Sequence, residues 1–161
     1  MQEVEQARAQ FLQAKDRLTR ALANTPDDRI NWSPSPSART PIHQVAHCAR
    51  SIKHILEQMG GSPFSIPTTD EADRDFRKWE LQFTTREQAL ELLEKNSAEY
   101  LAWLDQVTPE QLDTIAQLPF GLGAIPVRMW LSAPADHTNY HTAQIDYTQT
   151  IYGDQDWHLS A

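Results

Sequence analysis

Two histidines stand four residues apart near the end of the chain, at His137 and His141. Residues at this spacing lie on one face of a helix, about a turn from each other. At about 100° per residue, the apolar stripe of Val127, Leu131 and Ile145 falls on the same face, so both imidazoles are predicted to point inward. Neutral imidazole nitrogens on one helix face can bind a divalent metal at about 2.0–2.1 Å. The spacing therefore indicates a metal-binding pair.

A third ligand has to come from another part of the chain. His43 and His47 are again four residues apart, and His54 lies on the same side of their helix. On an ideal wheel, His47 lies about 160° from the middle of the apolar stripe of this segment. Periodicity alone therefore does not choose among these three histidines. Gln144 follows His141 by about one turn and is expected to be its hydrogen-bonding partner.

Non-metal interpretations of the same residues stay open. Two buried histidines can be satisfied by Asn, Gln or backbone partners without any ion. Cys48 adjoins His47, but consecutive side chains on a helix point about 100° apart, so we expect Cys48 to be an inert buried thiol. Four aromatic residues are expected to pack in the core or to line a pocket: Trp103, Trp130, Tyr140 and Tyr147.

Several other functions have no support in the chain. The chain lacks the Gly-x-Ser-x-Gly motif, which argues against a serine nucleophile. It also lacks the motifs Gly-x-x-x-x-Gly-Lys-Ser/Thr and Gly-x-Gly-x-x-Gly, which argues against nucleotide binding by a glycine-rich loop. The Glu-x-x-His pairs of ferritin-like bundles are missing too. The formal net charge is −8 and no run of Lys or Arg occurs, so nucleic-acid binding is not expected.

The cellular setting is predicted from what the chain contains. Its one cysteine forms no intrachain disulfide and fits a reducing compartment. The first ten residues are polar where a secretory signal has an apolar core. No stretch approaches the roughly 20 apolar residues of a membrane span. We therefore expect a cytoplasmic protein without a membrane partner.

Four long amphipathic helices are predicted to position these residues. The first covers residues 2–23, with apolar residues at steps of three and four. The second begins at Thr40, a good N-cap followed by proline, and ends at the two glycines of positions 60 and 61. The third begins at Thr85, which has capping-box spacing to Gln88. The last covers about 126–152, and Pro134 inside it predicts a kink or a break near Leu131.

The connections are less regular than these helices. The segment from Ser62 to about Asp75 is rich in Pro, Thr and Asp and has no assigned structure. Beyond it, Trp79, Leu81 and Phe83 are expected to lie over the core. A capping pattern at 108–111 predicts a short extra helix, and no strand is predicted. The fold class is therefore all-α, an antiparallel four-helix bundle with a long connection between helices 2 and 3. A crossover is one form that such a connection takes. Residues 1–153 form one domain, and 154–161 form a short polar tail.

The order of these motifs resembles the DinB/YfiT-like superfamily of bacterial proteins. The segments that carry the resemblance are the Trp/Pro-rich loop 32–36, the run 40–47, the pair His137 and His141 with Gln144, and the later Tyr147 and Gly153. Each motif is loose, but their combination and spacing are much more specific. The resemblance covers about residues 2–153.

The resemblance implies a bundle in which three histidines hold a divalent metal. His47 matches the ligand from the second helix because Cys48-Ala49-Arg50 follows it, and His137 and His141 match the terminal pair. Three imidazoles suit zinc, nickel, iron or manganese. Members often form dimers, and some transfer thiols such as bacillithiol, mycothiol or glutathione, whereas others are described as metal-dependent hydrolases.

These implications predict a metal-dependent enzyme that activates a thiol or water for a small-molecule substrate. Gln144, His43 and Tyr140 are expected around the ligands, as hydrogen-bonding partners or pocket residues. Many members have Arg-Gly-Gln where this chain has Thr142-Ala143-Gln144, which removes a basic group beside the metal. Two other hypotheses remain: a metal-free binding bundle, and a stress-linked protein that keeps the metal without catalysis.

Overall fold

The structure is a computed structural model that describes residues 2–156 and residue 158. Four long helices form a bundle: α1 (Gln2–Asn24), α2 (Pro41–Met59), α4 (Arg86–Gln106) and α6 (Ala133–Ile151). Helix α1 packs on α6, and α2 packs on both α4 and α6. This confirms the predicted all-α bundle. Of the predicted tail 154–161, residues 157 and 159–161 lie outside the described residues.

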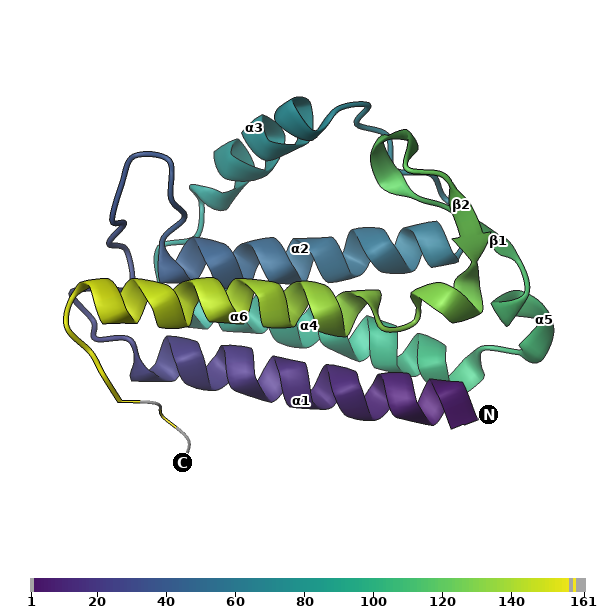
Figure 1. The fold of residues 1–161 in the computed structure, drawn as a ribbon, viewed down its shortest axis with the longest axis horizontal. Coiled ribbons are helices and arrows are strands. Elements are labelled where there is room, and N and C mark those ends of the chain that lie inside the picture. Colours follow the sequence, from purple (N-terminus) through teal and green to yellow (C-terminus); the bar gives the residue numbers. More distant parts are fainter. Residues whose placement is uncertain (1, 157, 159–161) are drawn as a thin grey trace.

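The direction of the helices follows from one long crossover. Figure 1 shows that α2 and α4 run the same way, and that α1 and α6 both run the opposite way. The connection from α2 to α4 returns across the outside of the bundle before α4 begins. Two bundle helices that follow each other in the chain, such as α2 and α4, can run in parallel only when a long connection of this kind joins them. The long connection, which the sequence predicted, therefore determines which helices of the bundle run in the same direction.

The helix starts lie where the capping residues predicted them. The Thr40 hydroxyl accepts from the backbone N–H of His43, and Pro41 occupies the first turn of α2. Thr85 and Gln88 form a full capping box at the start of α4. The short helix α5 (Pro109–Leu112) has a second capping box, between Thr108 and Gln111. Each box satisfies backbone N–H groups that have no partner inside the helix.

The long connection contains a helix that periodicity did not predict, α3 (Thr69–Glu80). It lies over α2 on the side away from α1 (Figure 1). Ala72, Phe76 and Glu80 are its buried residues, at steps of four, and they form the face turned to the bundle. The expectation that Leu81 covers the core is wrong, because its side chain is 68% exposed just after the helix ends.

The connection between α4 and α6 holds a small antiparallel hairpin, contrary to the prediction of no strands. Strand β1 (Ile115–Gln117) pairs with β2 (Ala124–Pro126), with Ala116 opposite Ile125. The turn between them contains the 3-10 segment Pro119–Gly121, and Phe120 there has a positive φ of 59°. Three-residue strands are too short to show the alternation by which strands are recognised in a sequence.

The predicted interruption near Leu131 is a complete break. A 3-10 turn, Val127–Trp130, precedes Leu131, and α6 starts two residues later at Ala133. Pro134 therefore lies in the first turn of α6, where its missing N–H leaves no helical hydrogen bond unmade. The break places His137 near the beginning of α6 rather than in the middle of a longer helix.

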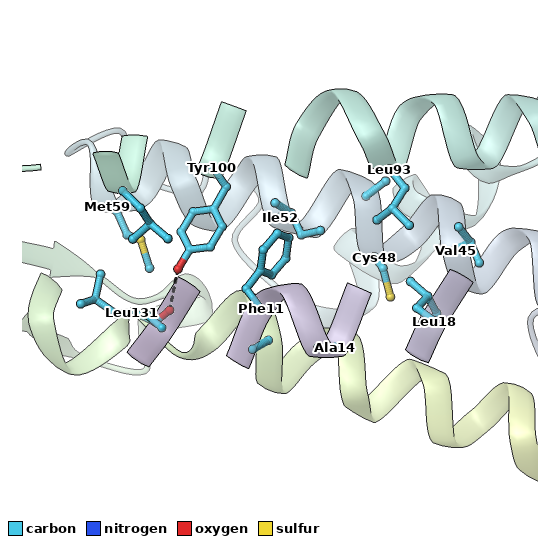
Figure 2. Close-up of a cluster of buried hydrophobic side chains, with 14 of the residues drawn as sticks. Phe11, Ala14, Leu18, Val45, Cys48, Ile52, Met59, Leu93, Tyr100 and Leu131 are labelled. Atoms are coloured by element: carbon cyan, nitrogen blue, oxygen red, sulfur yellow. Dashed lines mark hydrogen bonds between the residues drawn. The ribbon is translucent and has the colours of Figure 1, made fainter. Parts of the chain in front are cut away.

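The core lies between the four long helices (Figure 2). Phe11 of α1 meets Tyr100 of α4 edge to face, with ring centroids 4.9 Å apart. The Tyr100 hydroxyl donates to the Leu131 carbonyl at 2.8 Å and thereby satisfies the backbone at the break before α6. Cys48 is fully buried in this core, as expected. Among the described residues, no helix is both long enough and apolar enough to cross a membrane.

Candidate metal centre

Three imidazoles from two helices meet at one point of the bundle. His47 comes from α2, and His137 and His141 come from consecutive turns of α6. Their ring centroids are 4.5–5.3 Å apart. One nitrogen of each ring lies within 4.8 Å of the corresponding nitrogen of the other two. Two ligand nitrogens at 2.1 Å from an ion in a tetrahedral site are about 3.4 Å apart, so the three rings would have to move slightly closer together to share one ion.

Glu80, at the last position of α3, fixes the orientation of His47. Its Oε1 lies 2.8 Å from His47 Nδ1, and its Oε2 accepts from Arg39 Nε at 2.7 Å. Because a carboxylate only accepts, Nδ1 of His47 carries the proton and Nε2 keeps its lone pair. Carboxylate partners of this kind set the tautomer and the basicity of metal-binding histidines. Glu80 is only 1% exposed, and burial raises its pKa while the Arg39 guanidinium opposes that rise.

Two glutamines fix the orientation of His141 in the same way. Its Nδ1 lies 2.6 Å from Gln44 Oε1 and 2.8 Å from Gln144 Oε1. Amide oxygens only accept hydrogen bonds, so His141 also carries its proton on Nδ1. Its Nε2 is therefore free to bind an electrophile. The predicted position of Gln144 beside His141 agrees with this geometry.

His137 completes a donor set that fits a divalent metal. Its Nε2 is buried and has no hydrogen-bond partner among the described residues. A buried polar atom without a partner costs about 1–3 kcal/mol, and an ion between the three rings would remove that cost. Together the three rings present neutral nitrogen donors from two rigid helices, the donor type that zinc and similar ions accept. The residues present thus fit the metal.

Electrostatics keeps all three rings neutral, as metal binding requires. Burial, together with the nearby Arg39 charge, lowers the pKa of His47 from 6.5 to about 3. Burial also lowers the pKa of His137 to about 4 and that of His141 to about 2, with the neighbouring His47 adding to both. At neutral pH no proton competes with a metal for these nitrogens.

The other candidate residues lie around this cluster or apart from it. His43 does not join the three rings. Burial lowers its pKa, while the Glu80 charge and the Phe83 backbone oppose that shift. His54 contacts Arg50 and Glu57 instead. Tyr140 is 65% exposed, with its ring centroid 5.3 Å from that of His141. Tyr147 is 69% exposed and lies outside the core, but it lines a second pocket together with Tyr140, in agreement with the pocket-lining alternative.

Sequence reasoning missed Glu80, Arg39 and Gln44. A signal for α3 was present, because Thr68 and Glu71 have capping-box spacing, and the Thr68 hydroxyl indeed accepts from the Glu71 backbone N–H. With that start, Glu80 continues the buried row of Ala72 and Phe76 at steps of four. A buried glutamate on an otherwise apolar row of side chains needs a hydrogen-bonding or ion-pairing partner inside the protein.

A large cavity opens beside the histidines. It measures about 790 Å³ and lies between α2, α3, the hairpin turn and the start of α6. His47 and His137 are part of its wall. A cavity of this size is in the range of small-molecule sites. The arrangement places three possible metal ligands at the edge of a space large enough for an organic substrate.

Comparisons with known proteins agree with this architecture. A family model for the DinB superfamily matches residues 10–145. A crystal structure of a conserved protein from Enterococcus faecalis superposes with a TM-score of 0.69 and 18% identity, covering 93% of this chain and 97% of that one. At such identity the likeness shows the fold alone. No curated protein matches. Since the family model matches most of its length, the chain belongs to the DinB superfamily.

Proposed function

We propose that this protein is a metal-dependent enzyme that activates a thiol or water for reaction with a small organic molecule. His47, His137 and His141 hold the divalent ion in this proposal. The observation that carries it is the convergence of three neutral imidazoles, two of which also line a cavity of about 790 Å³. A structural metal site is closed by four protein ligands, whereas three ligands leave a position open.

The bound ion supplies Lewis-acid chemistry, which ionises a thiol or lowers the pKa of water towards about 7. The chain supplies the rest. Glu80 and the pair Gln44 and Gln144 hold the protons of two imidazoles on Nδ1, so that both Nε2 atoms stay available. The cavity walls keep water away from an apolar reactant and orient it beside the histidines.

Metal content is the direct test of the proposal. Protein purified without a histidine tag is analysed by mass spectrometry beside the variants His47→Ala, His137→Ala and His141→Ala. Each substitution removes one of three donors, so the metal should be lost from all three variants. His54→Ala is the matched control, because His54 lines the same cavity without joining the three rings. Circular dichroism checks that each variant is helical.

Two results would contradict the proposal. If a folded His141→Ala protein keeps its full metal content, the three rings are not the site. If the wild type neither contains a metal nor gains thermal stability from added zinc, nickel, iron or manganese, the histidines have a structural role. A ligand that binds only the native state must raise the melting temperature.

The choice between enzyme and non-catalytic binding protein needs a second measurement. Metal-loaded protein is incubated with electrophiles and with bacillithiol, mycothiol, glutathione or water as the nucleophile. Product formation that disappears in His137→Ala supports catalysis. Bound metal without any product supports the alternative, a metal-holding protein without catalysis.

We further propose a cytoplasmic location and a homodimer. The fully buried, unpaired Cys48 supports a reducing compartment. The dimer is proposed from the likeness to other superfamily members, and light scattering coupled to gel filtration tests it. The acidic net charge of −8 supports a small-molecule rather than a nucleic-acid partner.

A further inference from the structure

The cavity beside the histidines has walls that are largely apolar and aromatic. They come from α2, from the connection that contains α3, from the hairpin turn and from the segment before α6. The apolar wall residues are Ile55, Phe64, Phe76, Phe120, Met129 and Trp130. Contact with such walls stabilises a ligand in proportion to the apolar area that leaves water. The ligand therefore needs an apolar body.

The one arginine in the wall has no free charge to offer a ligand. Arg39 Nε donates to Glu80 at 2.7 Å, and an Nη of Arg39 donates to Asp73 at 2.8 Å. Its side chain is only 10% exposed. Among the described wall residues there is no other Arg or Lys. A carboxylate, sulfonate or phosphate group would therefore lose its water without gaining a cationic partner from the wall.

The acidic residue at the cavity mouth is in the opposite situation. Asp136 lies in the first turn of α6, next to His137, and is exposed. It lines the cavity and forms no ion pair with a basic side chain of residues 2–156 or 158. Tyr140 follows one turn later on the same wall. A carboxylate beside an aromatic ring is an environment that attracts organic cations.

We propose that the cavity binds apolar molecules that carry a positive charge, with the cation beside Asp136 and the apolar body between Phe76 and Phe120. This inference rests on the proposed function only in taking the ligand to be the substrate. A divalent ion held by the histidines would attract an anion, but the rest of the described wall offers that anion no unpaired Arg or Lys. The preferred substrate is thus an amphiphilic amine or quaternary ammonium compound rather than a polyanion.

Three probes with the same body and different charge test the preference. They are 4-phenylbutyl-trimethylammonium, 4-phenylbutan-1-ol and 4-phenylbutane sulfonate, and all three are poor metal ligands. Calorimetry measures their affinities for the full chain, both zinc-loaded and after chelator treatment. The ammonium probe should bind about fivefold more tightly than the alcohol, the advantage expected of one partly exposed charge pair. The sulfonate should bind more weakly than the alcohol.

Asp136→Asn should remove the ammonium advantage and leave the affinity of the alcohol within twofold of the wild type. Glu91→Gln is the control, because it removes one negative charge at an exposed position on α4, outside the cavity. It should keep the preference, which separates Asp136 from the general effect of the net charge. Ala133→Phe, which adds a ring at the cavity wall, should weaken all three probes together.

The proposal is overturned if none of the probes binds at millimolar concentration, or if the sulfonate binds as well as the ammonium probe. It is also overturned if Asp136→Asn keeps the full ammonium advantage. These results are independent of the test of the metal site. A protein without metal can still rank the probes by charge, and a metal-loaded protein can fail to do so.

Discussion

Replacing Glu80 by Gln tests whether α3 helps to build the metal site. Glu80 accepts two hydrogen bonds, one from His47 Nδ1 at 2.8 Å and one from Arg39 Nε at 2.7 Å. Glutamine has nearly the same shape, but one of its two terminal groups is an NH₂ that can only donate. If the amide oxygen faces Arg39, the NH₂ faces His47 Nδ1 and favours the tautomer with the proton on Nε2, the nitrogen that a metal would need. If the amide turns the other way, its NH₂ faces the Arg39 donor. The substitution thus changes the hydrogen bonding and the charge while it keeps the packing.

The expected effect on metal binding is a 10- to 100-fold loss of affinity, the usual result of removing a partner that orients a metal-binding histidine. This corresponds to about 1.4–2.7 kcal/mol. The metal-free protein should also lose stability, because Arg39 keeps its charge in a buried place. Breaking a buried ion pair costs about 3–5 kcal/mol. Asp73 still accepts from Arg39 at 2.8 Å, so we expect the lower end of that range.

Zinc affinity is measured by competition with a chromophoric chelator, and stability by urea unfolding of the metal-free protein. Glu99→Gln makes the same chemical change at an exposed position of α4 and should alter neither quantity. Arg39→Lys, which keeps the charge but loses the guanidinium geometry, should have an intermediate effect. A folded Glu80→Gln protein whose zinc affinity lies within twofold of the wild type would refute the role given to Glu80.

Three further outcomes are expected. Tyr100→Phe leaves the buried Leu131 carbonyl without its donor. The substitution should therefore lower the free energy of unfolding by about 1–2 kcal/mol, measured as a lower urea midpoint. An unchanged midpoint would mean that water replaces the hydroxyl. Cys48 is fully buried, and burial raises the pKa of its thiol. It should therefore react with a thiol reagent only after the protein unfolds. Rapid reaction of the native protein would contradict its place in the core. In the metal-free protein, the pKa values of the three clustered histidines are lowered from 6.5 to about 3, 4 and 2. The unfolded chain therefore takes up protons on these histidines below about pH 6.5, while the native state does not. The free energy of unfolding should be highest above that pH and fall as the pH drops from 6.5 towards 4. Urea midpoints at pH 7, 6 and 5 check this sign, and a rising midpoint would refute it.

The bundle could be predicted from the sequence because its helices carry strong local signals. Apolar residues at helical spacing from Val4 to Leu22 are all buried as expected. The caps at Thr40 and Thr85 set the starts of α2 and α4. These features depend on a few neighbouring residues, so no tertiary information is needed to find them. The break at Pro134 belongs to the same class, since proline acts on its own helix.

The environment of His47 could not be predicted in this way. On a helical wheel it lies far from the apolar stripe of α2, and only the family resemblance selected it over His43 and His54. In the structure, α3 covers that side of α2 and brings Glu80 to the ring. Which side of a helix is buried depends on what packs against it, and that is a property of the whole fold. For the same reason the role of Gln44 could not be predicted, because its hydrogen-bonding partner His141 lies 97 residues away in the sequence.

The cavity is built partly by the bundle helices and partly by the connections between them. Its histidines sit on α2 and α6, whereas much of its wall comes from the two excursions at residues 62–80 and 115–132. Laboratory evolution towards a new ligand can therefore vary the cavity-lining residues of these excursions and leave the four-helix scaffold as it is. Glu80 is an exception, since it ends one excursion and also holds a scaffold imidazole. Ala116, Val127 and Leu131 are further exceptions, because they belong to the core. A library that spares these positions should retain far more folded, metal-binding members than one that randomises them.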